Sequence, residues 1–216
     1  MSNKVTFDDR PLRTVISTDN LSYMGIPKRF HNTTLDDFKT NGSKQLRAFK
    51  SCVEDYINNL VYHLKKDGMG LCMLGSNGVG KTMMSCIIMR EVYKHRYTAR
   101  RVTFSEYISK YTFIWGANTP TEKESLETEF YTKYKAVDFL VLEEVGKEVD
   151  NKIATPILED LLRYREDKGL VTCICANLNP ETIHERYGES IFSLIQGNML
   201  PIIIETPDKR KERLHK

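Results

Sequence analysis

The sequence lacks long apolar runs. None of its apolar segments approaches the roughly 20 residues that a helix needs to cross a lipid bilayer. The first residues, Met1 to Arg13, are polar and charged, so they do not resemble an apolar secretion signal. Internal repeats and low-complexity tracts are also missing. We therefore expect a cytoplasmic protein with no membrane association.

A disulfide pattern is absent from the five cysteines of the sequence. An odd number of cysteines inside apolar segments is typical of a reduced interior. Cys173 and Cys175 are two residues apart in a strand-like run, so both point to the same face. A metal pair is one interpretation of this spacing, but no second Cys/His pair lies nearby. Buried core cysteines are the favoured interpretation. The five positions are Cys52, Cys72, Cys86, Cys173 and Cys175.

The charge is modest and uneven. The chain of 216 residues has a formal net charge of +3, and the segment Lys209 to Lys216 holds five basic residues and one glutamate. A basic tail of this kind fits either a polyanionic partner or a solvated end of the chain. We divide the sequence into an N-terminal arm (1–43) for docking a partner, a core (44–208) and this tail (209–216).

Strands and helices alternate through the core. Helical spacing runs from Leu46 to Leu64 and ends at Gly68 and Gly70, and a second helix is expected over Thr82 to Tyr97. Residues 105–135 mix helix with polar linker, and Thr155-Pro156 is expected to cap another helix. Such alternation predicts an α/β fold with a parallel sheet covered on both faces. The expected strands are Leu71–Leu74, Val102–Phe104, Val137–Leu142, Leu170–Cys175 and Leu200–Ile204.

A complete phosphate-binding motif, G-x-x-x-x-G-K-[ST], follows the first strand. Its glycines let backbone amides approach phosphate oxygens, and its lysine places a positive charge on the β- and γ-phosphates. The threonine hydroxyl is a magnesium ligand, and the following helix directs its positive end toward the phosphates. The sequence therefore predicts a site for ATP or ADP with Mg²⁺. The motif comprises Gly75, Ser76, Asn77, Gly78, Val79, Gly80, Lys81 and Thr82.

Two carboxylates end the strand around Leu142. In P-loop ATPases one such acid orients magnesium and a second polarises the attacking water. We expect Glu143 to serve the magnesium and Glu144 to act as the catalytic base. The usual pair is Asp-Glu, so the additional methylene of Glu143 is expected to shift the geometry of the metal site.

The ordered set of motifs resembles the AAA+ ATPases of the DnaC/DnaI helicase-loader and IstB transposition-helper group. The resemblance covers about Gly25 to Arg210, from the lead-in Gly25-Ile26-Pro27-Lys28-Arg29-Phe30 through the acidic strand Leu140–Gly146 to a sensor strand, Cys175–Asn179. A helix ending in an arginine, Leu162 to Arg165, also matches.

This resemblance implies a P-loop NTPase (AAA+, RecA-like) three-layer sandwich with strand order 5-1-4-3-2. It assigns Asn177 to the γ-phosphate or the attacking water and Arg210 to a second sensor. It also implies an ATPase of DNA replication that binds a hexameric, DnaB-like replicative helicase and single-stranded DNA. A homo-oligomer is a further expectation.

The sequence departs from the family in two places. The family pattern G-E-R-x-x-D-R carries an arginine finger, whereas residues 188–194 read G-E-S-I-F-S-L, with Ser190 at the first arginine position. A finger contributes a factor of 10³–10⁵ to the rate, so we expect weak hydrolysis unless Arg186 replaces it. Family loaders carry a separate helicase-binding domain ahead of the core, where this sequence has only about 40 residues. We therefore expect either that the arm docks a helicase by ordering on binding or that helicase binding is absent.

Aromatic and basic residues gather between the second and third expected strands, where family members bind single-stranded DNA. Stacking rings beside positive charges suit single strands, but a helix core would contain the same rings. The residues in this region are Tyr107, Lys110, Tyr111, Phe113 and Trp115, and they follow Arg100 and Arg101.

Three other functions compete with a helicase loader. One is a nucleotide-gated adaptor that hardly hydrolyses ATP, and another is an IstB-like transposition helper. A small-molecule kinase is disfavoured because the sequence offers no arginine-rich lid.

Overall fold

The computed structural model describes residues 11–149 and 151–205. Within them, five parallel strands form one sheet in the order β2-β3-β4-β1-β5. This is the predicted order 5-1-4-3-2 counted from the other edge. The strands are β1 (Gly70–Gly75), β2 (Ala99–Thr103), β3 (Phe139–Val145), β4 (Val171–Ala176) and β5 (Met199–Ile204).

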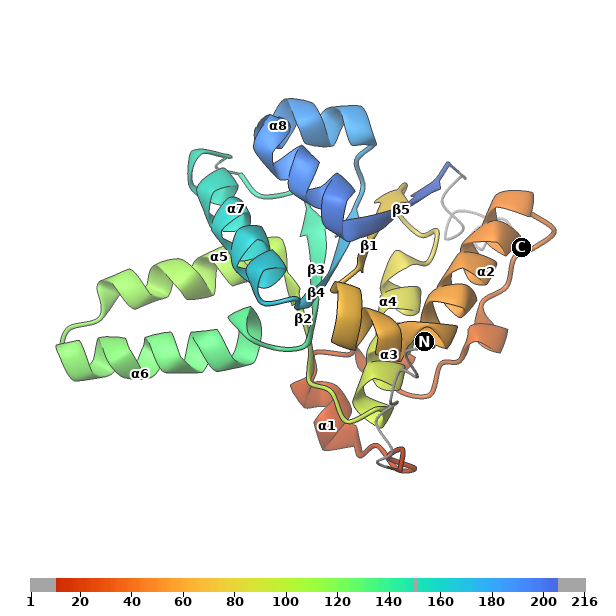
Figure 1. Ribbon diagram of the computed structural model, residues 1–216, viewed down its shortest axis with the longest axis horizontal. Helices are drawn as coiled ribbons and strands as arrows, with labels where there is room; N and C mark the ends of the chain where they lie inside the picture. The colour runs from red at the N-terminus through yellow and green to blue at the C-terminus, as the bar shows by residue number, and fades with distance from the viewer. Residues whose placement is uncertain (1–10, 150, 206–216) are drawn as a thin grey trace, which may run out of the picture.

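Helices cover both faces of the sheet and complete the three layers (Figure 1). One face packs against α2 (Lys44–Asn58) and α4 (Lys81–Lys94) through Leu71, Met73 and Val141. Alternate residues of the same strands, such as Cys72 and Leu74, face the opposite layer, as the two-residue period of a strand requires. That layer contains α5 (Phe104–Phe113), α6 (Pro120–Phe130), α7 (Asn151–Asp167) and α8 (Pro180–Asn198).

Short helices fill the connections. Residues 11–43 contain α1 (Thr18–Tyr23) and two short 3-10 helices, η1 (Lys28–Phe30) and η2 (Leu35–Asp37). α3 (Leu60–Tyr62) and η3 (His63–Asp67) follow α2 and end at Gly68, which has the left-handed φ of 63°. η4 (Ile114–Gly116) and η5 (Tyr131–Lys135) flank α6. None of the helices in the described ranges is long and apolar enough to cross a membrane.

The N-terminal arm is expected to have little structure of its own. Over residues 11–43 it is largely built from short pieces, but its apolar side chains enter the main core. Leu21, Met24, Ile26 and Phe38 are all buried in the cluster that contains α2 and α4. Its backbone also reaches the free edge of the sheet, where the Arg101 amide donates to the Met24 carbonyl oxygen (2.9 Å). The arm therefore lies against the layer formed by α2 and α4 and along the β2 edge of the sheet.

Several predicted boundaries shift. Phe104 begins a helix rather than ending β2, and β3 starts at Phe139 rather than Val137. The prediction that Thr155-Pro156 caps a helix is wrong, because α7 begins at Asn151 and contains Pro156. A proline in the second turn removes only one backbone donor, and the apolar face of Leu158, Leu161 and Leu162 secures the helix against the sheet.

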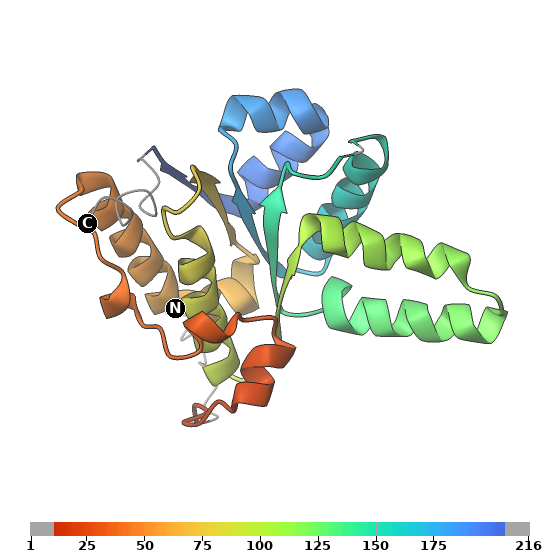
Figure 2. The same ribbon diagram turned by 180° about the vertical axis from the view of Figure 1, so that it is seen from behind.

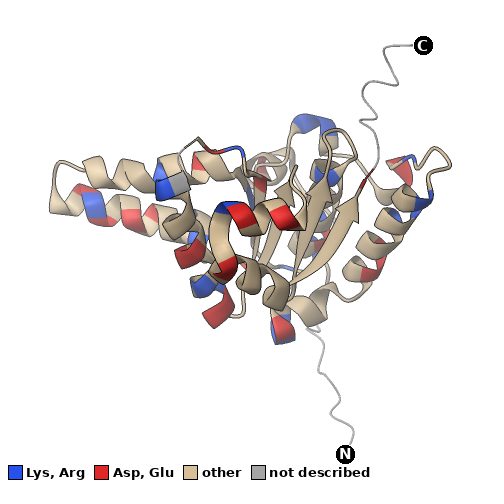
Figure 3. Cartoon of the chain, turned by 90° about the horizontal axis from the view of Figure 1, so that it is seen from above, with Lys and Arg blue, Asp and Glu red and all other residues tan. Residues whose placement is uncertain are grey.

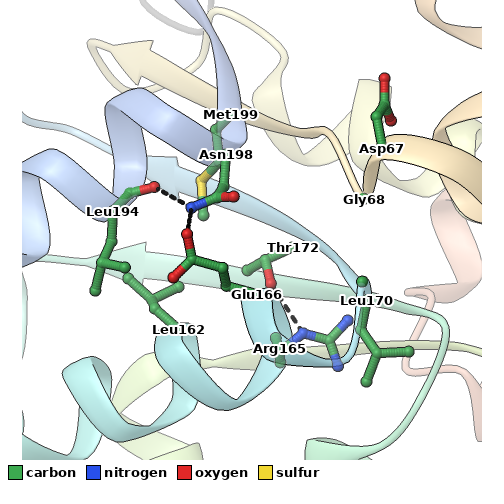
Figure 4. Close-up of a pocket in the computed structure, with 11 residues that line it drawn as sticks. Asp67, Gly68, Leu162, Arg165, Glu166, Leu170, Thr172, Leu194, Asn198 and Met199 are labelled. Atoms are coloured by element: carbon green, nitrogen blue, oxygen red, sulfur yellow. Dashed lines mark hydrogen bonds between the residues drawn. The ribbon is translucent and has the colours of Figure 1, made fainter.

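α7 closes with a buried arginine. Arg165 is 1% exposed and donates to the carbonyl oxygens of Val137 (2.9 Å) and Val171 (2.6 Å) and to the Thr172 hydroxyl (2.8 Å). Burial lowers the pKa of Arg165 to about 9, so the guanidinium is still charged at neutral pH. It ties together the chain segments that start β3 and β4. The adjoining cavity, about 30 Å³ (Figure 4), has room for one water and not for a nucleotide.

Candidate nucleotide site

The phosphate-binding loop connects β1 to α4 at the carboxyl end of the sheet (Figure 2). Gly75, Gly78 and Gly80 all have positive φ, as the tight turn requires. At Gly80 (φ 111°) a Cβ would lie 2.5 Å from the Phe38 ring of the arm. The arm thus packs directly on the loop, and only glycine fits at residue 80.

Lys81 lies at the centre of the loop. Its ammonium group donates to the carbonyl oxygens of Gly75 (2.6 Å) and Ser76 (2.9 Å) and to Asn177 Oδ1 (2.8 Å). Asn177 follows β4, and its amide nitrogen donates to Asn77 Oδ1 (2.7 Å). The structure therefore joins the expected sensor asparagine to the loop across about 100 residues of sequence.

Thr82 and Glu143 form the second part of the site. The Thr82 hydroxyl donates to Glu143 Oε2 (2.9 Å), and the carboxylate is 3% exposed. A hydroxyl beside one carboxylate is the hard oxygen set that Mg²⁺ takes in nucleotide sites, where it keeps several waters. The donors present therefore fit magnesium, which would balance phosphate charge when bound. These two side chains would hold it.

Glu144 lies apart from this network. A bulge after Glu143 interrupts the β3–β4 register, and Glu144 takes a left-handed φ of 60°. Its carboxylate is half exposed and accepts a hydrogen bond from Lys147 Nζ (2.9 Å). The strained backbone turns the second acid away from the strand, which leaves it open to solvent rather than bonded to the loop.

Arg210 lies outside the described residues, so its part in the site stays a prediction. Ser190 lies in α8 after Gly188, whose φ of 82° kinks the helix. Arg186 donates to Glu148 Oε1 (3.0 Å) and to the Glu148 carbonyl oxygen (2.6 Å), and the Tyr187 hydroxyl bonds the same carboxylate. Arg186 is therefore already bonded to Glu148 of its own chain, in a partly buried cluster.

Sequence reasoning missed two residues of the site. Ser85 Oγ (3.1 Å) and Arg101 Nε (3.3 Å) both donate to Glu143 Oε1. Arg101 is expected near DNA, but its guanidinium lies beside the Glu143 carboxylate instead. No local motif indicates this contact, which follows from the sheet register: Thr103 pairs with Glu143 in the parallel β2–β3 pair, so Arg101, two residues earlier on the same face, is the diagonal neighbour of Glu143.

Comparisons with known proteins find relatives among replicative helicase loaders. No family model matches the sequence. The helicase loader DnaC of Buchnera aphidicola is 23% identical over 197 residues, which cover 88% of this chain and 74% of that protein. The helicase loader DnaI of Bacillus subtilis is 24% identical over 136 residues, 62% of this chain and 41% of that protein. The chain is a homologue of the DnaC/DnaI helicase loaders.

Solved structures agree on the fold. A DnaC helicase loader superposes with a TM-score of 0.69 at 19% identity, covering 82% of this chain and 99% of that one. The replication initiator DnaA bound to AMPPCP and single-stranded DNA gives a TM-score of 0.66 at 18% identity, over 88% of this chain and 56% of that one. This DnaC/DnaI homologue therefore has the AAA+ P-loop fold.

Proposed function

We propose that the protein is an ATP-dependent helicase loader of DNA replication. The observation that carries the proposal is the network of Lys81, Thr82, Glu143 and Asn177 at one end of a DnaC-like sheet. These residues would bind ATP with Mg²⁺ through the loop, the lysine and one carboxylate. Replicative helicase loaders that are 23–24% identical to this chain support the same function. A loader of this kind would act on DNA in the cytoplasm.

We expect hydrolysis to be slow in the isolated protein. Glu144 is the candidate base, and its partial exposure leaves room for a water to approach. An arginine on a neighbouring subunit normally stabilises the charge that develops during phosphoryl transfer. Ser190 occupies the family position of that arginine, and Arg186 is bonded to Glu148. Nucleotide would then act mainly as a conformational signal, whether or not the protein forms a homo-oligomer.

Single-stranded DNA would bind the hairpin of α5 and α6, which projects from the sheet (Figure 1). Between its helices lies a groove of about 560 Å³ lined by Tyr111, Trp115, Phe130, Lys123 and Lys135 among others. Trp115 is 63% exposed and Phe113 is also exposed. Both present faces on which bases can stack.

Two residues of the aromatic and basic group do not line this groove. Tyr107 is buried between Phe130 and Tyr134, so it is a core residue of the hairpin. Arg100 is held by the Tyr23 carbonyl oxygen and the Tyr134 hydroxyl, away from the groove lining.

Charge on the hairpin is nearly balanced. Residues 104–135 hold four lysines and five glutamates, and both signs of charge are visible on the projecting hairpin (Figure 3). We therefore expect stacking to provide most of the DNA affinity. If only the two groove lysines contact phosphates, log K should fall with log salt at a slope of about −1.4, shallower than for a basic surface.

The hairpin can be tested with the intrinsic fluorescence of Trp115, because it is the only tryptophan in the chain. Oligo(dT) with Mg-ATP should quench its emission, and a duplex of equal length should not. Equal quenching by both, or none by either, would contradict DNA binding at this groove.

The partner would be a hexameric DnaB-like helicase, docked through the arm (1–43). Co-purification of the protein with a replicative helicase in Mg-ATP tests this partnership. Recovery of a transposase instead would favour an IstB-like helper. The engaged Arg186 also favours a nucleotide-gated adaptor, and phosphate release measured with and without single-stranded DNA separates it from an ATPase.

A further inference from the structure

Arg101 is a charged residue in a strand whose two buried residues, Ala99 and Val102, are apolar. It comes from β2, and its side chain is 18% exposed. Its Nε donates to Glu143 Oε1 at 3.3 Å, and its Nη1 donates to the Gly25 carbonyl oxygen at 3.3 Å. A single guanidinium therefore links the arm to the carboxylate of the proposed magnesium site.

The two oxygens of Glu143 have different partners. Oε2 accepts a hydrogen bond from the Thr82 hydroxyl, the other expected magnesium ligand. Oε1 accepts from Ser85 and Arg101. Those two donors fix the rotation of the carboxylate, which leaves Oε2 as the oxygen that faces Thr82. Glutamate has one more rotatable bond than the aspartate usual at this position, so it needs such restraint.

The arm fixes the other end of Arg101. Gly25 has a φ of 82°, and a Cβ at this residue would lie 2.6 Å from the Arg101 carbonyl oxygen. This close approach lets the arm backbone lie along β2, where the Met24 carbonyl oxygen accepts from the Arg101 amide (2.9 Å). The guanidinium is thus held from both sides, and its planar fork suits two acceptors in fixed directions.

We propose that Arg101 is a positioning residue for magnesium: it holds Glu143 Oε1 so that Oε2 is presented to the metal beside Thr82. The inference rests on the proposed nucleotide site and adds a residue to it. Residues that orient a metal ligand typically change metal affinity 10–100-fold when they are removed. Arg101 does not contact the phosphate-binding loop in any hydrogen bond described above, so its effect should be confined to the metal.

The test measures ADP affinity by calorimetry in excess Mg²⁺ and again in EDTA. The ratio of the two affinities is the magnesium factor. In Arg101→Met this factor should fall about 10-fold or more, while the affinity in EDTA stays within about twofold of wild type. Arg100→Met is the matched control: it is the neighbouring residue, it also loses an arm carbonyl contact (Tyr23), and it does not touch Glu143. Its magnesium factor should match wild type.

Arg101→Lys separates positioning from charge and serves if Arg101→Met fails to fold. Lysine keeps the positive charge but cannot bond Gly25 and Glu143 with a planar fork, so its magnesium factor should also fall. A wild-type factor in Arg101→Lys, or an unchanged or larger factor in Arg101→Met, would overturn the role of Arg101 while leaving nucleotide binding intact. Failure of the wild type to bind ADP in either buffer would overturn the nucleotide site itself, and the inference with it.

Discussion

Replacement of Lys81 by methionine should abolish nucleotide binding while the chain stays folded. Methionine keeps the aliphatic stem, which is almost fully buried, and removes the ammonium group. Three hydrogen bonds disappear, those to Gly75, Ser76 and Asn177. Because the freed loop carbonyls can reach water, we expect a loss of about 2 kcal/mol in the free energy of unfolding. For a chain of this size that lowers Tm by about 4–8 °C.

Nucleotide should shift the two proteins differently. At a free concentration 100 times Kd, Mg-ATP stabilises the wild type by about 2.7 kcal/mol, which corresponds to a Tm increase of about 5–10 °C. Lys81→Met should show no increase, because the charge that meets the β- and γ-phosphates has gone. Differential scanning calorimetry with and without Mg-ATP measures both effects.

Lys94→Met is the control for this experiment. Lys94 lies at the other end of α4 and pairs with Glu91 on the surface, so its variant should keep the full nucleotide shift. A nucleotide-dependent Tm increase of wild-type size in Lys81→Met would refute the assignment of residues 75–82 as the phosphate site.

Two further changes test other parts of the account. Glu144→Gln should leave the Kd for Mg-ATP within about twofold of wild type and lower phosphate release at least 100-fold, the usual contribution of a general base; release at the wild-type rate would exclude Glu144 as the base. Arg165→Met leaves several backbone carbonyls without a donor and should lower Tm by about 6–12 °C, or about 3 kcal/mol. The pKa of Arg165 is about 9 in the folded chain and higher in the unfolded chain, so the side chain is protonated in both states below pH 8. The Tm difference should therefore be constant from pH 6 to 8. A slope there would contradict the charged state.

The order of the sheet could be predicted because each expected strand is a short apolar run at regular spacing, and the family resemblance fixes how the strands are arranged. The phosphate loop could be placed to the residue, since its glycines, lysine and threonine act through local backbone geometry. Asn177 required the resemblance, because its bond to Lys81 joins distant parts of the sequence.

The interactions that sequence reasoning missed depend on tertiary contacts. Arg101 meets Glu143 only through the β2–β3 register, and it meets Gly25 only because the arm returns to the sheet edge. Arg186 bonds Glu148 across 38 residues, which no local motif indicates. The start of α7 differs from the prediction for a related reason: Thr155-Pro156 is a typical helix start, but packing of the apolar face outweighs this local preference.

ATP-controlled helicase loading can be measured directly on closed circular single-stranded DNA coated with single-strand-binding protein. A ring-shaped helicase reaches such a circle only if the ring is opened. We expect wild-type protein with Mg-ATP to raise the amount of DnaB-like helicase on the circle well above the level without loader, and Lys81→Met to leave it at that level. Equal loading by both proteins, or none by the wild type, would contradict the proposed function.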